Sequence, residues 1–134
     1  MAEKVDVVCP GLPQPIGPYS TAIKYGNMLF ISGQLGIDPA TGQLSSPGIA
    51  GQTRTILQNL SHLLESLGGG TASVVKTTVF LTSLLDFEVF NEVYAEFFSF
   101  CPPARSTVEV SNLPKDALVE IEAIAMLPKG DIPM

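Results

Sequence analysis

The sequence predicts an α+β domain in which two helices cover one face of a β-sheet. Three observations lead to this fold class: segments with the composition of strands, two segments with helical spacing of apolar residues, and their order along the chain. Strand-like segments come first, followed by a helix, a strand, a second helix and two strands. No repeat, low-complexity tract or linker divides the 134 residues, so a single domain over residues 1–134 is expected.

Four segments have the composition of strands, being apolar, rich in β-branched residues or bounded by glycines. They are residues 27–32, 74–81, 106–110 and 119–126. In the last of these, apolar residues alternate with Glu120 and Glu122, which places the two carboxylates on one face of the strand. Residues 38–42 (DPATG) predict a turn between strand-like segments.

Two segments carry their apolar residues at helical spacing. In residues 49–67 the stripe consists of Ile56, Leu57, Leu60, Leu64 and Leu67, and three glycines at 68–70 predict its end. The second helix is expected over residues 86–98, with Asp86 as its N-cap. Its apolar stripe consists of Phe87, Phe90, Val93, Tyr94 and Phe97.

The composition predicts self-association. Charged residues make up 15% of the chain, against about 25% in typical soluble domains, and the mean hydropathy is +0.33. No segment approaches the ~18 consecutive apolar residues of a membrane span, so no membrane partner is expected. Because large apolar patches are rare on monomers, the second face of the sheet is expected to pack on other copies of the chain.

Several chemistries lack their usual residues. The net charge of −6, with scattered basic residues, argues against nucleic acid as a partner. The only histidine, His62, falls within a helical pattern and is expected at the surface, so neither a zinc site nor a histidine-based triad is predicted. No phosphate-binding loop is present, and we expect no metal and no cofactor. Cys9 and Cys101, without a signal-peptide pattern, predict free thiols in a reducing cytoplasm.

Arg105 stands in an unusual context. It follows a Pro-Pro-Ala sequence and opens the strand at 106–110. A guanidinium group matches a carboxylate with two parallel hydrogen bonds, which suggests a binding role. The alternative is an ordinary ion pair, with Glu120 or Glu122 as the partner, since most exposed arginines form pairs of little consequence.

Five segments together resemble the RidA/YjgF family, in order and with similar spacing. They are residues 16–22 (IGPYSTA), 31–34 (ISGQ), 75–81 (VKTTVFL), 103–110 (PARSTVEV) and 113–125 (LPKDALVEIEAIA). The resemblance covers nearly the whole chain. It implies a chorismate-mutase-like (YjgF-like) fold with a mixed sheet and two helices on one face. It also implies a homotrimer whose sheets form a central barrel, with clefts at the subunit interfaces.

The resemblance also implies an activity, the hydrolysis of enamines and imines such as 2-iminobutanoate and 2-iminopropanoate to 2-keto acids and ammonia. In such proteins the residue matching Arg105 holds the substrate carboxylate, with help from the backbone at the position of Thr107. Glu120 would activate or position the attacking water, or it would merely orient Arg105. Residues that match the lining of the family's cleft are Tyr19, Gly33 and Asn91.

Two other functions stay open. The same cleft would serve a trimeric binding or chaperone-like module that holds carboxylate metabolites without turnover. Relatives have also been described as translation inhibitors that cleave RNA, which the charge of −6 makes the least attractive choice. The chain departs from common family patterns at Thr107, where many bacterial members carry cysteine, and at residues 68–73, which lack an expected aspartate-containing turn.

Overall fold

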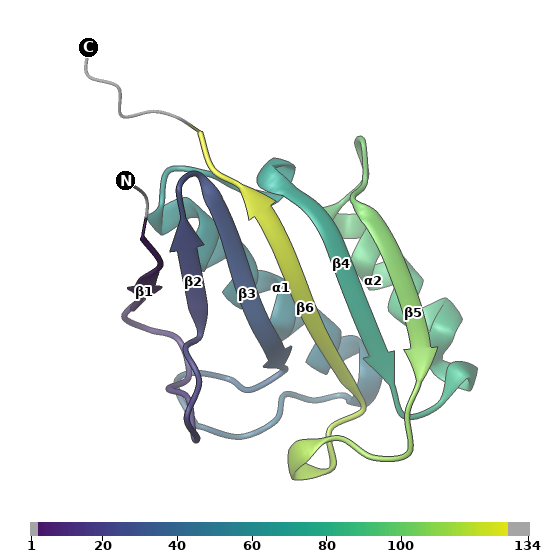
Figure 1. Ribbon diagram of the computed structural model, residues 1–134. Helices are drawn as coiled ribbons and strands as arrows, with labels where there is room; N and C mark the ends of the chain where they lie inside the picture. The colour runs from purple at the N-terminus through teal and green to yellow at the C-terminus, as the bar shows by residue number, and fades with distance from the viewer. Residues whose placement is uncertain (1–2, 129–134) are drawn as a thin grey trace.

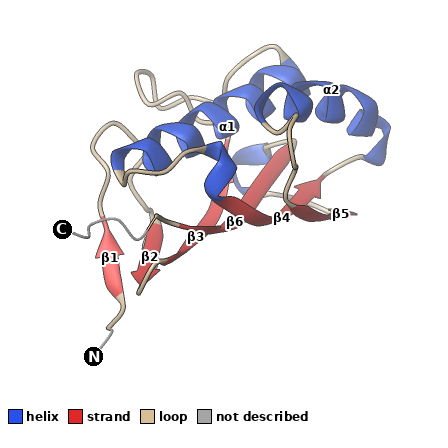
Figure 2. Cartoon of the chain, turned by 90° about the horizontal axis from the view of Figure 1, so that it is seen from above, coloured by secondary structure: helices blue, strands red, loops and turns tan. Residues whose placement is uncertain are grey.

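The computed structural model describes residues 3–128 and shows two helices packed on one face of a mixed sheet (Figures 1 and 2). The sheet has six strands in the order β1-β2-β3-β6-β4-β5. The strands are β1 (Val5–Val7), β2 (Ala22–Tyr25), β3 (Met28–Leu35), β4 (Val74–Leu81), β5 (Ala104–Glu109) and β6 (Val119–Met126). The helices are α1 (Gly48–Ser66) and α2 (Phe87–Phe97). The predicted α+β class and helix placement are confirmed.

One pair of strands is parallel. β4 pairs with β5 in parallel, and α2 forms the crossover between them, whereas the other neighbours in the sheet pair antiparallel. In this register Arg105 lies opposite Thr77, and Glu120 lies opposite Phe80. The register therefore fixes the faces from which Arg105 and Glu120 project.

The predicted strands are present, with some differences in extent. β3 continues to Leu35, beyond the expected end at residue 32, and β5 begins at Ala104 rather than at residue 106. β1 and β2 were not predicted. The turn at residues 38–42 is confirmed, because the backbone N–H of Gly42 donates to the carbonyl of Asp38 at 2.8 Å and Gly42 has a φ of +75°.

The predicted end of the first helix is confirmed. α1 ends at Ser66, Gly68 adopts a φ of +85°, and the N–H of Gly69 donates to the carbonyl of Leu64 at 2.9 Å. His62 lies on the exposed side of α1, as expected. The residues of the predicted stripe are buried or packed against the core: Ile56, Leu57, Leu60, Leu64 and Leu67.

The start of α2 agrees with the prediction in position, but its capping contact differs. Asp86 occupies the N-cap position but makes no side-chain capping hydrogen bond. A short 3₁₀ turn, Leu84–Asp86, precedes the helix instead, and the Ser83 hydroxyl accepts a hydrogen bond from the N–H of Leu85 at 3.1 Å. The predicted stripe of α2 is largely buried, except that Phe87 is 37% exposed.

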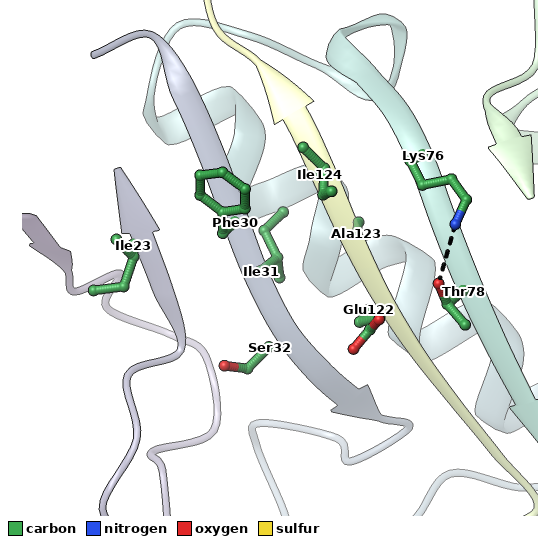
Figure 3. Close-up of a pocket in the computed structure, with 9 residues that line it drawn as sticks. All are labelled: Ile23, Phe30, Ile31, Ser32, Lys76, Thr78, Glu122, Ala123 and Ile124. Carbon is green, nitrogen blue, oxygen red and sulfur yellow. Dashed lines mark hydrogen bonds between the residues drawn. The ribbon is translucent and has the colours of Figure 1, made fainter. Parts of the chain in front are cut away.

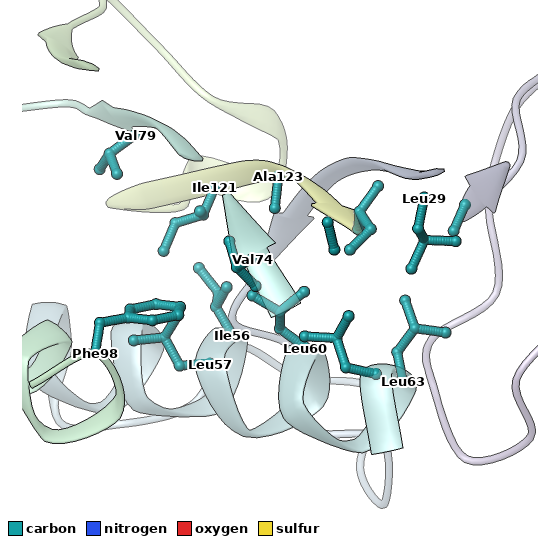
Figure 4. Packing of buried hydrophobic residues seen from close by; sticks show 14 of the residues in the cluster. Leu29, Ile56, Leu57, Leu60, Leu63, Val74, Val79, Phe98, Ile121 and Ala123 are labelled. Carbon is teal, nitrogen blue, oxygen red and sulfur yellow. The ribbon is translucent and has the colours of Figure 1, made fainter. Parts of the chain in front are cut away.

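The hydrophobic core lies between the two helices and the sheet (Figure 4). Leu57 and Ile56 of α1 are fully buried, as are Leu29 of β3 and Val79 of β4. Burying one such side chain stabilises the fold by about 1.5–3 kcal/mol. In β6 the buried residues alternate with Glu120 and Glu122, so the helices cover only the face opposite to these carboxylates.

The other face of the sheet is not covered by any described element, and we call it the open face. Strand alternation and register place Tyr25, Phe30, Val108 and Met126 on it, with exposed fractions between 39% and 50%. A hollow of about 340 Å³ on this face is lined by residues that include Phe30, Lys76 and Glu122 (Figure 3). No helix among residues 3–128 is long and apolar enough to cross a membrane.

Candidate functional site

Arg105 projects toward α2. Its register partner Thr77 is fully buried and contacts α2 through Tyr94, and residues in register share a face of the sheet. The Cζ atom of Arg105 lies 5.6, 5.4 and 4.8 Å from the ring centroids of Phe87, Phe90 and Tyr94. These distances fall within the range of cation–π attraction, so three rings of one helix hold the guanidinium group.

The positive charge of Arg105 has no carboxylate partner among the described residues. The only ion pair found in residues 3–128 joins Arg54 to Glu96 at 3.0 Å, on the surface. The alternative that Arg105 forms an ion pair with Glu120 or Glu122 is therefore wrong within this chain. The aromatic rings contact the guanidinium group but supply no anion. The N–H donors of the group therefore stay available to the carboxylate of a ligand.

Thr107 and Asn91 lie on β5 and α2, the two elements that carry Arg105 and the rings that contact it. Thr107 follows Arg105 by two residues on β5 and so shares its face, and its Oγ1 is buried without a hydrogen-bond partner in the described structure. Asn91 lies four residues after Phe87 and three before Tyr94 on α2, which puts it on the helix face of the rings that contact Arg105. These residues form the first group of the candidate site.

Glu120 belongs to the open face. Its neighbours Val119 and Ile121 are buried beneath the helices, so its own side chain points the other way. A Cβ atom on Gly33 would overlap the Glu120 carboxylate, which explains why glycine suits this position of β3. Burial raises the pKa of Glu120 above its ordinary value, and the nearby charge of Glu122 raises it further. A carboxylate with a raised pKa is a better base at neutral pH.

Tyr19 and Gly33 line a second hollow, of about 250 Å³. Gln34 and Lys115 also line it, and Tyr19 is 51% exposed. Since Gly33 contacts Glu120 as well, Tyr19, Gly33 and Glu120 form the second group of the candidate site.

The sheet separates the two groups within one chain. Arg105 and Glu120 project from opposite faces, on strands that are two spacings apart, or about 10 Å. A single copy therefore does not bring Arg105 and Glu120 to one small substrate. Because the two side chains project from opposite faces, Glu120 does not orient Arg105 within the same chain. A site that contains both groups requires residues from two copies.

The role of the aromatic residues of α2 was not predicted from the sequence. Phe90 and Tyr94 were predicted only as part of a core stripe, yet both also contact Arg105. The signal was available, because a crossover helix between parallel strands packs on those strands, and Arg105 is the second residue of β5.

Among residues 3–128 no cluster of three His, Cys, Asp or Glu side chains is placed to hold a metal ion. Cys9 is buried, Cys101 is exposed, and both are free thiols, as predicted. His62 lies with its Nε2 atom 3.3 Å from the carbonyl oxygen of Pro10.

Known proteins resemble this chain over most of its length. The chain matches the family model described as Endoribonuclease L-PSP over residues 11–127. It is 56% identical to a RutC family protein of Pyrococcus horikoshii over 113 residues, which cover 84% of this chain and 90% of the relative. It is 43% identical over 114 residues to the human protein named 2-iminobutanoate/2-iminopropanoate deaminase, covering 85% of this chain and 83% of that protein.

Solved structures show the same fold. RidA from an Antarctic Psychrobacter species superposes with a TM-score of 0.87 at 41% identity, covering 92% of this chain and 99% of that one. E. coli TdcF with bound serine superposes with a TM-score of 0.86 at 38% identity, again covering 92% and 99%. Sequence and structure agree that this chain belongs to the RidA family, within the group described as Endoribonuclease L-PSP.

Proposed function

We propose that the chain is a cytoplasmic deaminase that hydrolyses reactive enamines and imines of 2-amino acids, such as 2-iminobutanoate and 2-iminopropanoate. The observation that supports this proposal is the set of residues that surround Arg105. Its guanidinium group is held by three aromatic rings, and no carboxylate among the described residues neutralises it. Such a group is prepared to bind a small carboxylate by two parallel hydrogen bonds. The names of related deaminases support the same chemistry.

The proposed reaction begins with the substrate carboxylate on Arg105 and the backbone of Thr107. A water molecule adds to the electrophilic imine carbon while Glu120 of a neighbouring copy accepts one of its protons. Glu120 passes this proton to the imine nitrogen, so the resulting tetrahedral intermediate carries a hydroxyl and an amino group on one carbon. Transfer of the hydroxyl proton to the amino nitrogen through Glu120 then lets ammonia leave, and the hydroxyl oxygen becomes the carbonyl of the 2-keto acid. The raised pKa of Glu120 suits this exchange of protons near neutral pH.

We further propose that three copies associate through their open faces, so that the sheets form a central barrel. Support comes from the exposed apolar side chains on that face and from the separation of Arg105 and Glu120 within one chain. Tyr19, Gly33 and Asn91 would complete the walls of each cleft between copies. Light scattering should give about three times the 14.2 kDa mass of the chain. A mass near that of one chain at micromolar concentration would overturn the assembly.

The test of the activity is release of 2-ketobutyrate in a threonine dehydratase reaction. Adding the purified protein should accelerate the release, and Arg105→Ala should abolish the acceleration. Arg54→Ala is the matched control, because Arg54 is an exposed arginine in a surface ion pair and should keep full activity. Equal rates with and without the protein would contradict the proposal.

A binding module without turnover is the second candidate, favoured by one observation. A related structure, that of E. coli TdcF, contains bound serine, an amino acid that carries a carboxylate. Under this alternative the chain binds 2-ketobutyrate through Arg105 but leaves the dehydratase reaction unchanged. Cleavage of RNA is less favoured, because the chain has a net charge of −6.

A further inference from the structure

We infer that Tyr94 is a positioning residue for Arg105, with its hydroxyl fixed to Thr77 and its ring holding the guanidinium group in the orientation that receives a carboxylate. This inference rests on the proposed function, because it concerns the same arginine. It assigns to a buried tyrosine of α2 a part in ligand binding that extends beyond the packing of the core.

The hydroxyl of Tyr94 is anchored to the strand next to Arg105. Tyr94 is 6% exposed, and its Oη atom lies 2.7 Å from Oγ1 of Thr77, which is fully buried on β4. Thr77 is also the register partner of Arg105 across the parallel β4–β5 pair. The hydrogen bond therefore ties the ring to the part of the sheet from which the Arg105 side chain leaves.

The ring itself is held on both sides. Its centroid lies 5.3 Å from that of Phe90 and 4.7 Å from that of Phe98, so the ring cannot swing away without disturbing the core. Of the three rings near Arg105, that of Tyr94 is the nearest to the guanidinium carbon, at 4.8 Å. Burial raises the pKa of Tyr94, which keeps the hydroxyl neutral and able to share a hydrogen bond with Thr77.

Fixing an arginine in advance favours binding. A free arginine side chain loses rotamer freedom when it receives a ligand, whereas one already held on an aromatic face loses less. The benefit is greater for a ligand that carries a carboxylate than for its neutral amide, since the two carboxylate oxygens accept two parallel hydrogen bonds from the guanidinium group. Tyr94 should therefore affect the preference for a carboxylate more than it affects binding in general.

The experiment compares the affinities for 2-ketobutyrate and for its neutral amide, measured by titration calorimetry on the full-length protein. Tyr94→Leu removes the ring and the hydroxyl and should reduce the preference for the carboxylate about tenfold, as expected for a desolvated cation–π contact. Tyr94→Phe keeps the ring but leaves the Thr77 hydroxyl without its partner, and should reduce the preference about threefold.

Phe98→Leu is the matched control. Phe98 packs against Tyr94 with the ring planes tilted by 46°, and both residues are 6% exposed. Among the described residues, the cation–π contacts of Arg105 are with Phe87, Phe90 and Tyr94 and do not include Phe98. This variant should lower the melting temperature while keeping the ratio of the two affinities. A fall in the ratio for Phe98→Leu as large as that for Tyr94→Leu would show that a loosened core causes the effect, and would overturn the inference.

Two further results separate this inference from the proposed function. If Arg105→Ala loses the preference for the carboxylate while both Tyr94 variants keep it, the positioning role is overturned and the carboxylate site stands. If Arg105→Ala keeps the preference, the proposed carboxylate site itself fails. Should Tyr94→Leu not fold, Tyr94→Phe and Thr77→Val take its place, and an unchanged ratio in both would overturn the inference.

Discussion

Arg105 and Glu120 project from opposite faces of one sheet. Arg105 lies in register with Thr77, which contacts α2, whereas Glu120 lies in register with Phe80 and alternates with residues buried under the helices. Rotation of either side chain cannot carry it through a hydrogen-bonded sheet. Their cooperation on one substrate therefore requires that each cleft takes Arg105 from one copy and Glu120 from another.

Mixed assemblies should recover activity. Arg105→Ala and Glu120→Gln are each expected to be impaired, but refolding them together in equal amounts should restore about one quarter of the native clefts. Such clefts combine the intact arginine of one variant with the intact glutamate of the other. The measurement is release of 2-ketobutyrate by the co-refolded sample against the two variants refolded separately. Activity no greater than the average of the two would show that both residues act from the same copy.

Arg105→Lys should lower kcat/KM by at least about two orders of magnitude. Lysine keeps the charge but lacks the planar fork, and it cannot lie flat on the rings of Phe90 and Tyr94. The substrate carboxylate would then be held less well and the imine carbon would be misplaced. Steady-state kinetics on 2-iminobutanoate checks this. A variant with full activity would disprove the carboxylate clamp.

Glu120→Gln should lower kcat more than it weakens the binding of an unreactive keto acid. Glutamine keeps the size of the side chain and much of its hydrogen bonding but cannot accept the proton from water. Turnover and the Kd of 2-ketobutyrate are measured on the same preparation. Retention of full turnover would mean that the attacking water is activated by the backbone or by the substrate.

The same substitution should change how stability depends on pH. Because the pKa of Glu120 is raised in the folded state, the native protein binds more protons than the unfolded chain between the ordinary and the raised pKa. Stability therefore falls as the pH rises through this window. Glu120→Gln should melt at a higher temperature than the native protein at pH 8, and the difference should vanish below the ordinary pKa of a glutamate. Thermal denaturation of both proteins from acidic to basic pH checks this prediction, and a difference that does not depend on pH would contradict it.

Thr107→Val should be tolerated. The Oγ1 atom of Thr107 is buried and has no hydrogen-bond partner among the described residues, so replacing the hydroxyl by a methyl group removes an unsatisfied polar atom. The melting temperature should stay the same or rise, and turnover should change little, because only the backbone of this residue is proposed to bind substrate. A large loss of turnover with unchanged stability would assign the hydroxyl a direct contact with the substrate.

Local patterns predicted the parts of the fold that bury much apolar surface. The apolar stripes of α1 and α2 repeat over several helical turns, and the alternation in β6 repeats over several residue pairs. Both periods could therefore be recognised in the sequence. β1 has only three residues, and β2 has only four, including the polar Lys24. Both strands are too short to show a period of alternation. β1 pairs with β2, and β2 pairs with β3 across the two residues 26–27, so both strands depend on their strand partners, which the composition of such short segments does not report.

The candidate site was predictable in its residues but not in its arrangement. The position of Arg105 before a strand and the shared face of Glu120 and Glu122 were both visible in the sequence. That Arg105 faces α2 depends on the parallel register of β4 and β5, which joins segments separated by a whole helix. Asp86 stands at the predicted N-cap position, but it also ends a 3₁₀ turn, and its side chain makes no capping hydrogen bond.

If copies associate through the open face as proposed, this face links the concentration of the protein to its proposed activity. Side chains such as Tyr25, Phe30 and Met126 leave water only when copies associate, so by mass action the melting temperature should rise with protein concentration. Dilution would separate the copies, and so remove the clefts between them, before it unfolds the chains. A ligand that contacts two copies would oppose this dissociation. The concentration of the chain in a cell would then determine which fraction of the copies is assembled and active, without any separate inhibitor.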